Sequence, residues 1–520
     1  MRLLLSTCLL ASAISLHAQP AAGLAWGDLG DGTFANPVLN ADYSDPDVIR
    51  VGDKYYMTCS EFHFMGIPIL ESSDLVNWKL IARVYDSMDG YDGMNRYGDG
   101  SWAPAIRHHD GRFFIYFCTP NDGLFMTSAV NPEGPWEPLH HVKKVSGWED
   151  PCPLWDADGN AYLGRSALGG GPIILHRMSP DGKTLLDDGK EIYHGPVAEG
   201  TKLFIKDGKY YLNIPEGGVG TGWQQIGFAD NIYGPYAMRT VLEQGSTDTN
   251  GPHQGALVDT PDGQWWFYHF QGTDCLGRVV HLQPVKWADD GYPRIGTDYD
   301  GNGIGEPMKI VNKPSFAKSS TPSIVATSDN FDAGLGLHWQ FNHNPIPENI
   351  STDSKGRLHI AMSEAPRLRE ARNQLTQKLM GYSGSATVEL DASQFADDSR
   401  AGLLVLGNRT IGFGIVKSPA GLIIYTEDNG NIRLLDKAAK KVWLRISYSA
   451  PDRKFTPAYS FDGKKFTTLP ALSNREGDWK GVRLGLFAYS PLVKSQVSDK
   501  NQPEAIFDNF LYITDHISHK

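Results

Sequence analysis

Three carboxylates recur at one phase of a repeated sequence pattern. Five turn signals built around Asp and Gly each precede an aromatic strand. The residues eight positions before the five turn aspartates are Asp45, Trp102, Asp150, Glu199 and Gln254, and three of these are carboxylates. Carboxylates that converge repel one another and lose solvation, which raises the pKa of at least one of them. One group can then be a protonated acid and another an ionised base, as hydrolysis of a glycosidic bond requires. Trp102 offers a flat face for a sugar ring.

Two simpler interpretations of these carboxylates compete with catalysis. Asp45-Pro46 and Glu199-Gly200 are ordinary turn pairs, and any one of them alone would more often be structural. Alternatively, the three carboxylates could hold a structural cation on a central axis. The shared phase of all three favours catalysis, which does not exclude a cation.

The elements that must position these residues follow from the same repeat. The turn aspartates stand at 53, 110, 158, 207 and 262, so the repeat is about 50 residues long and contains only strands. Such a repeat is typical of a β-propeller with one four-stranded blade per repeat, and five repeats predict five blades. A β-solenoid has shorter and more regular repeats, and coincidental hairpins in a sandwich would be spaced less evenly. If the strand before each turn is innermost, the carboxylates meet at one mouth of the channel.

Composition agrees with a folded chain of several domains. A length of 520 residues predicts two to four domains, and 41% hydrophobic with 21% charged residues excludes a disordered or coiled-coil protein. The net charge of −12 argues against nucleic acid as the main partner. High counts of Gly (56) and Pro (32) beside 13 Trp, 22 Tyr and 22 Phe predict short strands, turns and surfaces that suit sugars.

Four segments divide the chain. Residues 1–18 have a positive charge, a short apolar run and a small residue before a polar break, which predicts a signal peptide. Residues 19–312 hold the predicted propeller. Residues 313–327 are rich in Ser, Pro, Lys and Thr and predict a linker. Residues 328–520 contain alternating strands without the repeat, which predicts a β-sandwich.

The signal peptide predicts secretion, and we expect a periplasmic protein. The residues around Cys8 only loosely match a lipobox, so a cell-surface lipoprotein is disfavoured. Later segments are too short or too polar to span a bilayer, and no membrane insertion is expected. An even number of cysteines in a secreted chain permits disulfides, but we expect buried free thiols at Cys59, Cys118, Cys152 and Cys275.

The motifs around the carboxylates resemble glycoside hydrolase family 43, which includes β-xylosidases and α-L-arabinofuranosidases. The matching stretches cover much of residues 34–310 and are 36–53, 101–104, 150–151, 199–203, 251–255 and 277–284. The stretches 329–332, 337–340 and 371–377 resemble the lectin-like C-terminal domain of the same enzymes. The resemblance therefore implies an all-β chain, a five-bladed β-propeller followed by a concanavalin-like β-sandwich. In the family, the sandwich packs on the propeller, and in some members it lends a loop to the active-site rim.

The resemblance also implies roles for the matching residues. It implies that Asp45 is the general base, that Glu199 is the general acid, and that Asp150 tunes and orients this acid. It implies that Trp102, Gln254 and Arg278 contact the substrate. It places His253 near an axial water or calcium ion. The family inverts anomeric configuration, and no cofactor is required, although a structural calcium stays open. The sequence departs from the family at Glu199-Gly200-Thr201, where many members have Glu-Gly-Pro. Glu216 is a further acid of the same blade and is given no catalytic role.

We expect an exo-acting inverting glycosidase that releases terminal α-L-arabinofuranose from plant cell-wall polysaccharides or oligosaccharides, such as xyloglucan or arabinoxylan. The alternative is a β-D-xylosidase that acts on xylo-oligosaccharides. A non-catalytic carbohydrate-binding propeller is a different class, and the presence of both Asp45 and Glu199 counts against it. A propeller scaffold for proteins is a third option. The expected partner is an oligosaccharide or polysaccharide, with no nucleic acid and no obligate protein partner.

Overall fold

The computed structural model describes residues 27–317, 325–473, 479–492 and 502–514. The predicted signal peptide, with Cys8, and the middle of the predicted linker lie outside these ranges. Apart from strands, the described residues form three 3-10 helices, η1 (Ser315–Ala317), η2 (Pro347–Asn349) and η3 (Leu368–Glu370). In these ranges no helix reaches the length and apolar character that a bilayer crossing requires. The four cysteines of this part are buried free thiols, as predicted.

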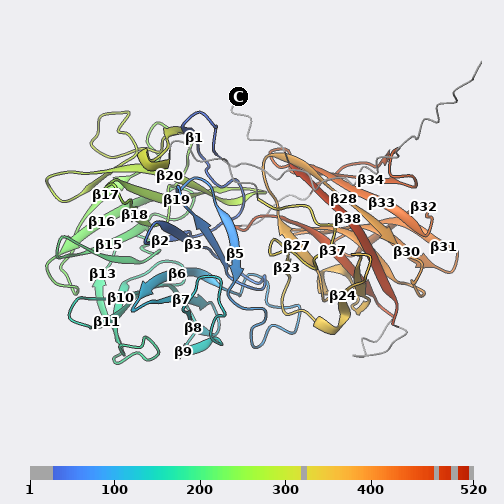
Figure 1. Cartoon of the computed structure of the whole chain (residues 1–520), viewed down its shortest axis with the longest axis horizontal. Helices are drawn as coiled ribbons and strands as arrows, with labels where there is room; N and C mark the ends of the chain where they lie inside the picture. The colour runs from blue at the N-terminus through green and yellow to red at the C-terminus, as the bar shows by residue number, and fades with distance from the viewer. Residues whose placement is uncertain (1–26, 318–324, 474–478, 493–501, 515–520) are drawn as a thin grey trace, which may run out of the picture.

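The N-terminal half of the molecule is a five-bladed β-propeller, which confirms the prediction (Figure 1). Each blade is an antiparallel sheet of four consecutive strands. In blade order the strands are β2 (Asp47–Val51), β3 (Lys54–Thr58), β4 (Pro68–Ser72) and β5 (Lys79–Arg83); β6 (Trp102–His109), β7 (Arg112–Thr119), β8 (Gly123–Ala129) and β9 (His140–Lys144); β10 (Trp148–Trp155), β11 (Ala161–Ala167), β12 (Ile173–Met178) and β13 (Lys190–Tyr193); β14 (Lys202–Lys206), β15 (Lys209–Glu216), β16 (Trp223–Ala229) and β17 (Ala237–Leu242); and β18 (Leu257–Asp259), β19 (Trp265–Thr273), β20 (Gly277–Trp287) and β21 (Pro293–Ile295).

Tight turns join the first two strands of the blades, where the sequence placed its turn signals. In blade 2, Asp110 and Gly111 have φ of 47° and 73°, and in blade 4 Asp207 and Gly208 have φ of 50° and 75°. Two successive residues with positive φ are typical of a type I′ hairpin, whose twist matches that of the strands on either side. This match explains why short Asp-Gly pairs mark the blades.

The two ends of the propeller sequence meet and close the ring. Strand β1 (Thr33–Ala35) pairs antiparallel with β22 (Ile310–Asn312). The side chain of Asn36 spans to blade 5, where Nδ2 donates to the Leu282 carbonyl at 2.9 Å and Oδ1 accepts from the Leu282 amide at 2.8 Å. Buried amides of this kind hold the first segment against the last blade.

The C-terminal half is a concanavalin-like β-sandwich of two eight-stranded sheets. The first sheet holds β23 (Gln340–Phe341), β26 (Ser363–Glu364), β27 (Leu375–Lys378), β29 (Arg400–Leu406), β30 (Thr410–Ser418), β31 (Gly421–Asp428), β32 (Asn431–Lys437) and β37 (Arg483–Ser490). The second holds β24 (Ile350–Thr352), β25 (Leu358–Ala361), β28 (Ser383–Asp391), β33 (Lys441–Ser449), β34 (Lys454–Ser460), β35 (Thr467–Thr468), β36 (Leu472–Ser473) and β38 (Glu504–Thr514).

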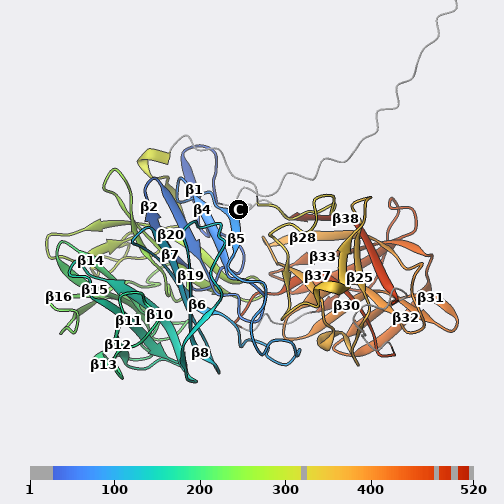
Figure 2. The ribbon, with the colours of Figure 1, turned by 60° about the horizontal axis from the view of Figure 1, so that its bottom comes forward.

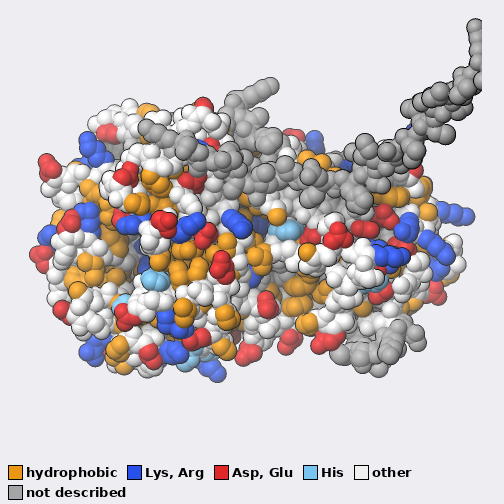
Figure 3. Space-filling model, in the orientation of Figure 1, with side chains coloured by type: hydrophobic (Ala, Val, Ile, Leu, Met, Phe, Trp, Pro, Cys, Tyr) orange, Lys and Arg blue, Asp and Glu red, His pale blue; other side chains and the backbone are white. Residues whose placement is uncertain are grey.

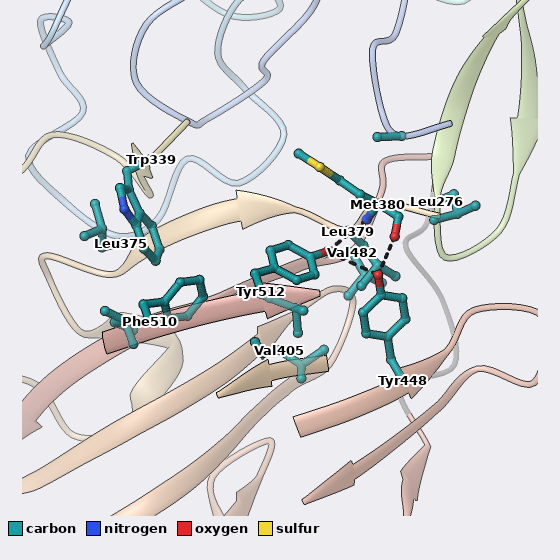
Figure 4. Close-up of a cluster of buried hydrophobic side chains, with 14 of the residues drawn as sticks. Leu276, Trp339, Leu375, Leu379, Met380, Val405, Tyr448, Val482, Phe510 and Tyr512 are labelled. Atoms are coloured by element: carbon teal, nitrogen blue, oxygen red, sulfur yellow. Dashed lines mark hydrogen bonds between the residues drawn. The ribbon is translucent and has the colours of Figure 1, made fainter. Parts of the chain in front are cut away.

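The core of the sandwich continues into the propeller. Figure 4 shows Leu276 of the propeller beside this cluster, with the Met380 amide donating to Oη of Tyr512 at 3.0 Å. Trp339 packs on Phe510, with ring centroids 4.7 Å apart, and is only 5% exposed. Trp339 is therefore part of the core and offers no open platform for sugar.

The propeller and the sandwich lie side by side in both views of the ribbon (Figures 1 and 2). At their interface Glu61 is fully buried and accepts ion pairs from Arg483, Lys378 and Arg83, at 2.5, 2.9 and 3.4 Å. Burial alone would raise the pKa of Glu61, but the three cations outweigh it and hold that pKa below its ordinary value. Elsewhere Lys and Arg are interspersed with Asp and Glu, as the face in Figure 3 shows.

Candidate active site

A residue in the left-handed region of backbone conformation lies just before the inner strand of each blade or within its first three residues. These residues are Asp45 (φ 56°), Ala103 (40°), Asp150 (52°), Gly200 (61°) and Gln254 (36°). Each stands six positions before the last inner-strand residue that pairs across the hairpin, so the five are equivalent. Counting eight positions back from the turn aspartate therefore finds the equivalent residue in the blades of Asp45, Asp150 and Gln254. In the other two blades the count finds Trp102 and Glu199, which lie one residue before the equivalent Ala103 and Gly200.

The one-residue difference comes from the turns. In blades 2 and 4 the turn aspartate is the first residue of a two-residue loop. In blade 1 the aspartate is the second residue of the loop, and the loops of blades 3 and 5 are longer. Counting from the aspartate therefore shifts blades 2 and 4 by one position relative to the others.

Asp45 is held between an arginine and a serine. Its Oδ1 accepts from Nη1 of Arg278 at 2.7 Å, and its Oδ2 accepts from the Ser60 hydroxyl at 2.5 Å. The same hydroxyl accepts from the Ala103 amide at 2.6 Å, which links blade 1 to blade 2. Asp45 is 3% exposed, so its carboxylate has one fixed orientation.

Asp150 joins three neighbouring blades. Its Oδ2 accepts from the Ser166 hydroxyl at 2.6 Å and from the Gly200 amide at 2.7 Å, and its Oδ1 accepts from Nε2 of Gln254 at 2.9 Å. Burial, followed by the negative charge of Glu199, raises the pKa of Asp150, while the donors of Ser166 and Gly200 work against that rise. Asp150 thus responds electrostatically to Glu199.

Glu199 pairs with a buried histidine. Nε2 of His253 lies 2.7 Å from Oε1 of Glu199, and the side chain of His253 is 1% exposed. The Nδ1 atom of His253 is buried and has no hydrogen-bond partner among the described residues. That single orphaned nitrogen suits a hydrogen-bonded water, whereas calcium takes about six to eight oxygen ligands. The side chains around His253 therefore do not fit calcium.

One group of side chains with metal-ligand spacing lies elsewhere. Within the described ranges, Asp298, Asp300 and Glu306 bring their oxygens within 4.8 Å of one another. Asp298 and Asp300 are exposed, and Glu306 already accepts from the amides of Tyr299, Asp300 and Ser246. These bonds account for the position of Glu306 without an ion.

A fourth acid stands next to Asp150. Glu149 occupies a β-bulge of the β10–β11 pair and is 6% exposed, and its Oε1 has no partner among the described side chains and amides. Burial, together with the charges of Asp150 and Glu199, raises the pKa of Glu149 to about 9. Glu149 is therefore a neutral acid at neutral pH, and the sequence did not single it out.

An aromatic side chain from the sandwich reaches the same place. The ring of Trp479 lies 4.4 Å from that of Phe62 and 5.0 Å from that of Trp102, centroid to centroid. The guanidinium of Arg278 lies 5.6 Å from the centroid of Trp479. Since Arg278 also contacts Asp45, Trp479 borders the carboxylate cluster from the second domain.

Comparisons with known proteins give the family of both domains. A model of the glycosyl hydrolases of family 43 matches residues 34–293, and a model of the β-xylosidase C-terminal concanavalin A-like domain matches residues 328–512. The chain belongs to glycosyl hydrolase family 43. The solved structure of a family 43 protein from Bacillus licheniformis, in a mutant form, superposes with a TM-score of 0.80 at 27% identity, covering 92% of this chain and 99% of that one.

Three curated relatives of this family 43 hydrolase carry names of activities. A protein of Xylanibacter ruminicola, provisionally named a β-xylosidase, is 49% identical and covers 93% of this chain and 94% of its own length. A β-xylosidase of Formosa agariphila is 33% identical and covers 89% of each chain. A non-reducing end α-L-arabinofuranosidase of Bacteroides ovatus is 30% identical and covers 64% of this chain and 65% of its own length.

Sequence reasoning about this family 43 hydrolase missed three kinds of residue. Ser60 and Ser166 follow their aspartates by 15 and 16 positions, a spacing that the repeat itself would have revealed. Trp479 carries no local signal, because only the docking of the domains brings it to the site. Glu149 is an acid whose burial no residue pattern reports. The carboxylate of Glu216 has partners of its own, because the Tyr193 hydroxyl donates to it at 2.6 Å and Nε2 of Gln225 at 3.1 Å.

Proposed function

We propose that this family 43 hydrolase is an exo-acting β-D-xylosidase that removes terminal xylose from xylo-oligosaccharides with inversion. The observation that carries the proposal is the cluster of Asp45, Asp150 and Glu199 from three blades, in which the charges of Asp45 and Glu199 both act on Asp150 and each carboxylate has its own hydrogen-bond partner. The β-xylosidase names of the relatives at 49% and 33% identity support xylose as the sugar.

In the proposed reaction Asp45 is the general base. It takes a proton from a water molecule whose oxygen attacks the anomeric carbon, and Arg278 and Ser60 fix its two oxygens for that task. Glu199, oriented by His253, gives a proton to the leaving glycosidic oxygen. The bond between the anomeric carbon and that oxygen breaks as the bond to water forms, so the configuration inverts.

Asp150 positions and tunes this pair. It belongs to the third blade and accepts hydrogen bonds from the Gly200 amide, next to Glu199 on the fourth blade, and from Gln254 on the fifth. Gln254 would then act through Asp150 as well as on the substrate.

The aromatic side chains of the rim support exo action. Trp102, Phe62 and Trp479 pack together beside Asp45, so the wall combines both domains. A wall of this kind favours the end of a chain over its interior and gives the terminal sugar an aromatic surface. An open channel along the propeller face would instead suit internal cleavage.

Release of α-L-arabinofuranose is the second candidate. The sequence analysis expected this activity first. The relative that is named an α-L-arabinofuranosidase is 30% identical to this chain, whereas the two relatives named β-xylosidases are 49% and 33% identical. Both sugars are pentoses, and a chain with either activity would act on xylan or arabinoxylan. The relatives thus favour the xyloside, which the sequence analysis held as the alternative.

The deciding experiment measures the rates at which the protein hydrolyses 4-nitrophenyl β-D-xyloside and 4-nitrophenyl α-L-arabinofuranoside, side by side. We expect the higher kcat/KM on the xyloside, and proton NMR should detect α-xylose as the first product from xylobiose. Asp45→Asn should lower kcat on the xyloside by about 10²- to 10⁴-fold, whereas Asp53→Asn in the exposed hairpin turn should not. A preference for the arabinofuranoside would replace the xylosidase proposal, and full activity of D45N would refute the assigned base.

Binding of xylo-oligosaccharides without any product would instead support the non-catalytic propeller. Isothermal titration of wild-type protein with xylotriose, followed by chromatography of the same sample, separates these outcomes. Unchanged Tm values for D45N and D53N would show that a loss of activity is chemical.

A further inference from the structure

A groove runs between the two domains, next to the aromatic rim. It has a volume of about 530 Å³ and lies between a loop of the propeller and a segment of the sandwich. The residues that matter for the argument are Asn95 and Tyr97 on the propeller and Arg367, Arg369 and Glu370 on the sandwich. We call it the junction groove. The Tyr97 hydroxyl donates to the Arg369 carbonyl and ties its two walls together.

The junction groove begins directly behind the rim. Trp102 donates from Nε1 to the carbonyl of Gly98 at 2.8 Å, and Gly98 is the residue after Tyr97. A methyl group on Gly98 would lie 3.4 Å from a ring carbon of Trp479 and 3.4 Å from Nζ of Lys480. A substrate whose terminal sugar lies against Trp102 and Trp479 therefore has its next units within reach of the groove.

The cations of the groove differ in how they are paired. Arg367 of the groove pairs with Glu370 at 2.5 Å, and Arg96, which follows the groove residue Asn95 but does not line the groove, pairs with Asp99 and Asp122 at 2.8 and 2.5 Å. Arg369, in contrast, forms no ion pair with any described residue. Its Nη1 donates instead to the Asn408 carbonyl at 3.2 Å.

Arg369 is also held in a fixed place. Its guanidinium lies 4.1 Å from the centroid of the Tyr97 ring, which stabilises the cation and limits its motion. Behind it, burial and then the charges of His343, Lys480, Arg483 and Arg369 keep the pKa of His63 well below its ordinary value. The wall is thus locally positive in a chain whose net charge is −12.

We propose that the junction groove binds the substrate units beyond the cleaved sugar and that Arg369 receives the carboxylate of a uronic-acid side group. The proposal rests on the proposed xylosidase function and names the class of chain on which that function acts, an acidic xylan fragment. A guanidinium presents paired donors that match a carboxylate, and a preordered one loses little entropy on binding. Glu370 is neutralised by Arg367 and does not oppose the incoming charge.

The experiment compares two substrates at low ionic strength. One is xylotetraose, and the other is xylotetraose with one 4-O-methyl-glucuronosyl group on an inner xylose. We expect the wild type to prefer the acidic substrate in kcat/KM. Arg369→Gln should lower the ratio of acidic to neutral kcat/KM by about three- to fivefold, and Arg369→Lys should restore part of it. Salt at about 0.5 M should lower the wild-type ratio in the same direction, because it screens the pair.

The matched control is Arg433→Gln, an exposed arginine of β32 outside the groove, which should leave both rates unchanged. An unchanged ratio in R369Q, or a wild type that prefers the neutral substrate at low salt, would overturn the proposal. If the wild type hydrolyses neither substrate nor the aryl xyloside, the xylosidase function fails instead. Titration calorimetry with the acidic tetraose then tests the groove alone, since R369Q must still bind it more weakly than R433Q.

Discussion

Arg483 of the sandwich and Glu61 of the propeller form a buried ion pair, with 2.5 Å between Nη2 and Oε2. Lys378 of the sandwich and Arg83 of the propeller reach the other oxygen of the same carboxylate. One acid therefore balances cations from both domains, and Trp479 stands only four positions before Arg483. The placement of Trp479 at the site depends on this contact.

Glu61→Gln should destabilise the molecule. It leaves the buried Lys378 and Arg483 and the half-buried Arg83 without their counter-charge, and loss of one partner of a buried pair costs about 3–5 kcal/mol. Denaturant unfolding measures the change, with the exposed Glu133→Gln as control. Equal stability of the two variants would show that Glu61 is not the electrostatic centre of the interface.

Trp479→Ala should impair catalysis while the fold persists. The change removes the ring that borders Phe62, Trp102 and Arg278, so the substrate and the Arg278 side chain lose their fixed geometry. We expect kcat/KM on the aryl xyloside to fall by about 10- to 100-fold, mostly through KM, with an unchanged Tm. Trp479→Phe should recover part of the loss, and wild-type kinetics in the alanine variant would contradict the role.

Ser166→Ala should move the pH profile. The hydroxyl of Ser166 stabilises the ionised form of Asp150, so its removal raises the pKa of Asp150 further. The acid limb of kcat/KM on the aryl xyloside should therefore shift to higher pH. The control is Ser246→Ala, which removes a hydroxyl that donates to Glu306 and has no contact with the three carboxylates. A limb that stays in place would show that Asp150 does not govern it.

Glu149→Gln should stabilise the protein increasingly as the pH rises from about 5 to 9. Folded Glu149 has a pKa of about 9, whereas the unfolded chain ionises near its model value of 4.5, so wild-type stability declines between these values. Glutamine does not titrate and avoids this decline. Tm measured at pH 5, 7 and 9 should show a widening gap in favour of the variant, and a constant gap would mean that Glu149 is ionised throughout.

The repeated parts of the molecule could be predicted from the sequence. Asp110-Gly111 and Asp207-Gly208 form the hairpins that their dipeptides favour, and this local chemistry indicated the number of blades and the positions of Asp45 and Asp150. The one-residue offset at Glu199 could not be foreseen, because loop length becomes visible only once strand pairing is known.

Features that depend on tertiary packing were beyond local reasoning. Trp479 reaches the site through the docking of two domains, and the neutrality of Glu149 follows from burial that no residue pattern reports. The rim combines Trp102 and Trp479, which come from distant parts of the chain, so local reasoning could not assemble it or weigh xylose against arabinofuranose.

The position of Trp479 has a consequence for how the molecule matures. A ribosome makes Asp45, Asp150 and Glu199 early and Trp479 near the end of synthesis. A nascent chain that has completed the propeller already carries the three carboxylates but has no aromatic wall from the second domain. A chain that terminates before Trp479 would hold all three carboxylates but would lack both the aromatic wall and Arg483, the buried partner of Glu61.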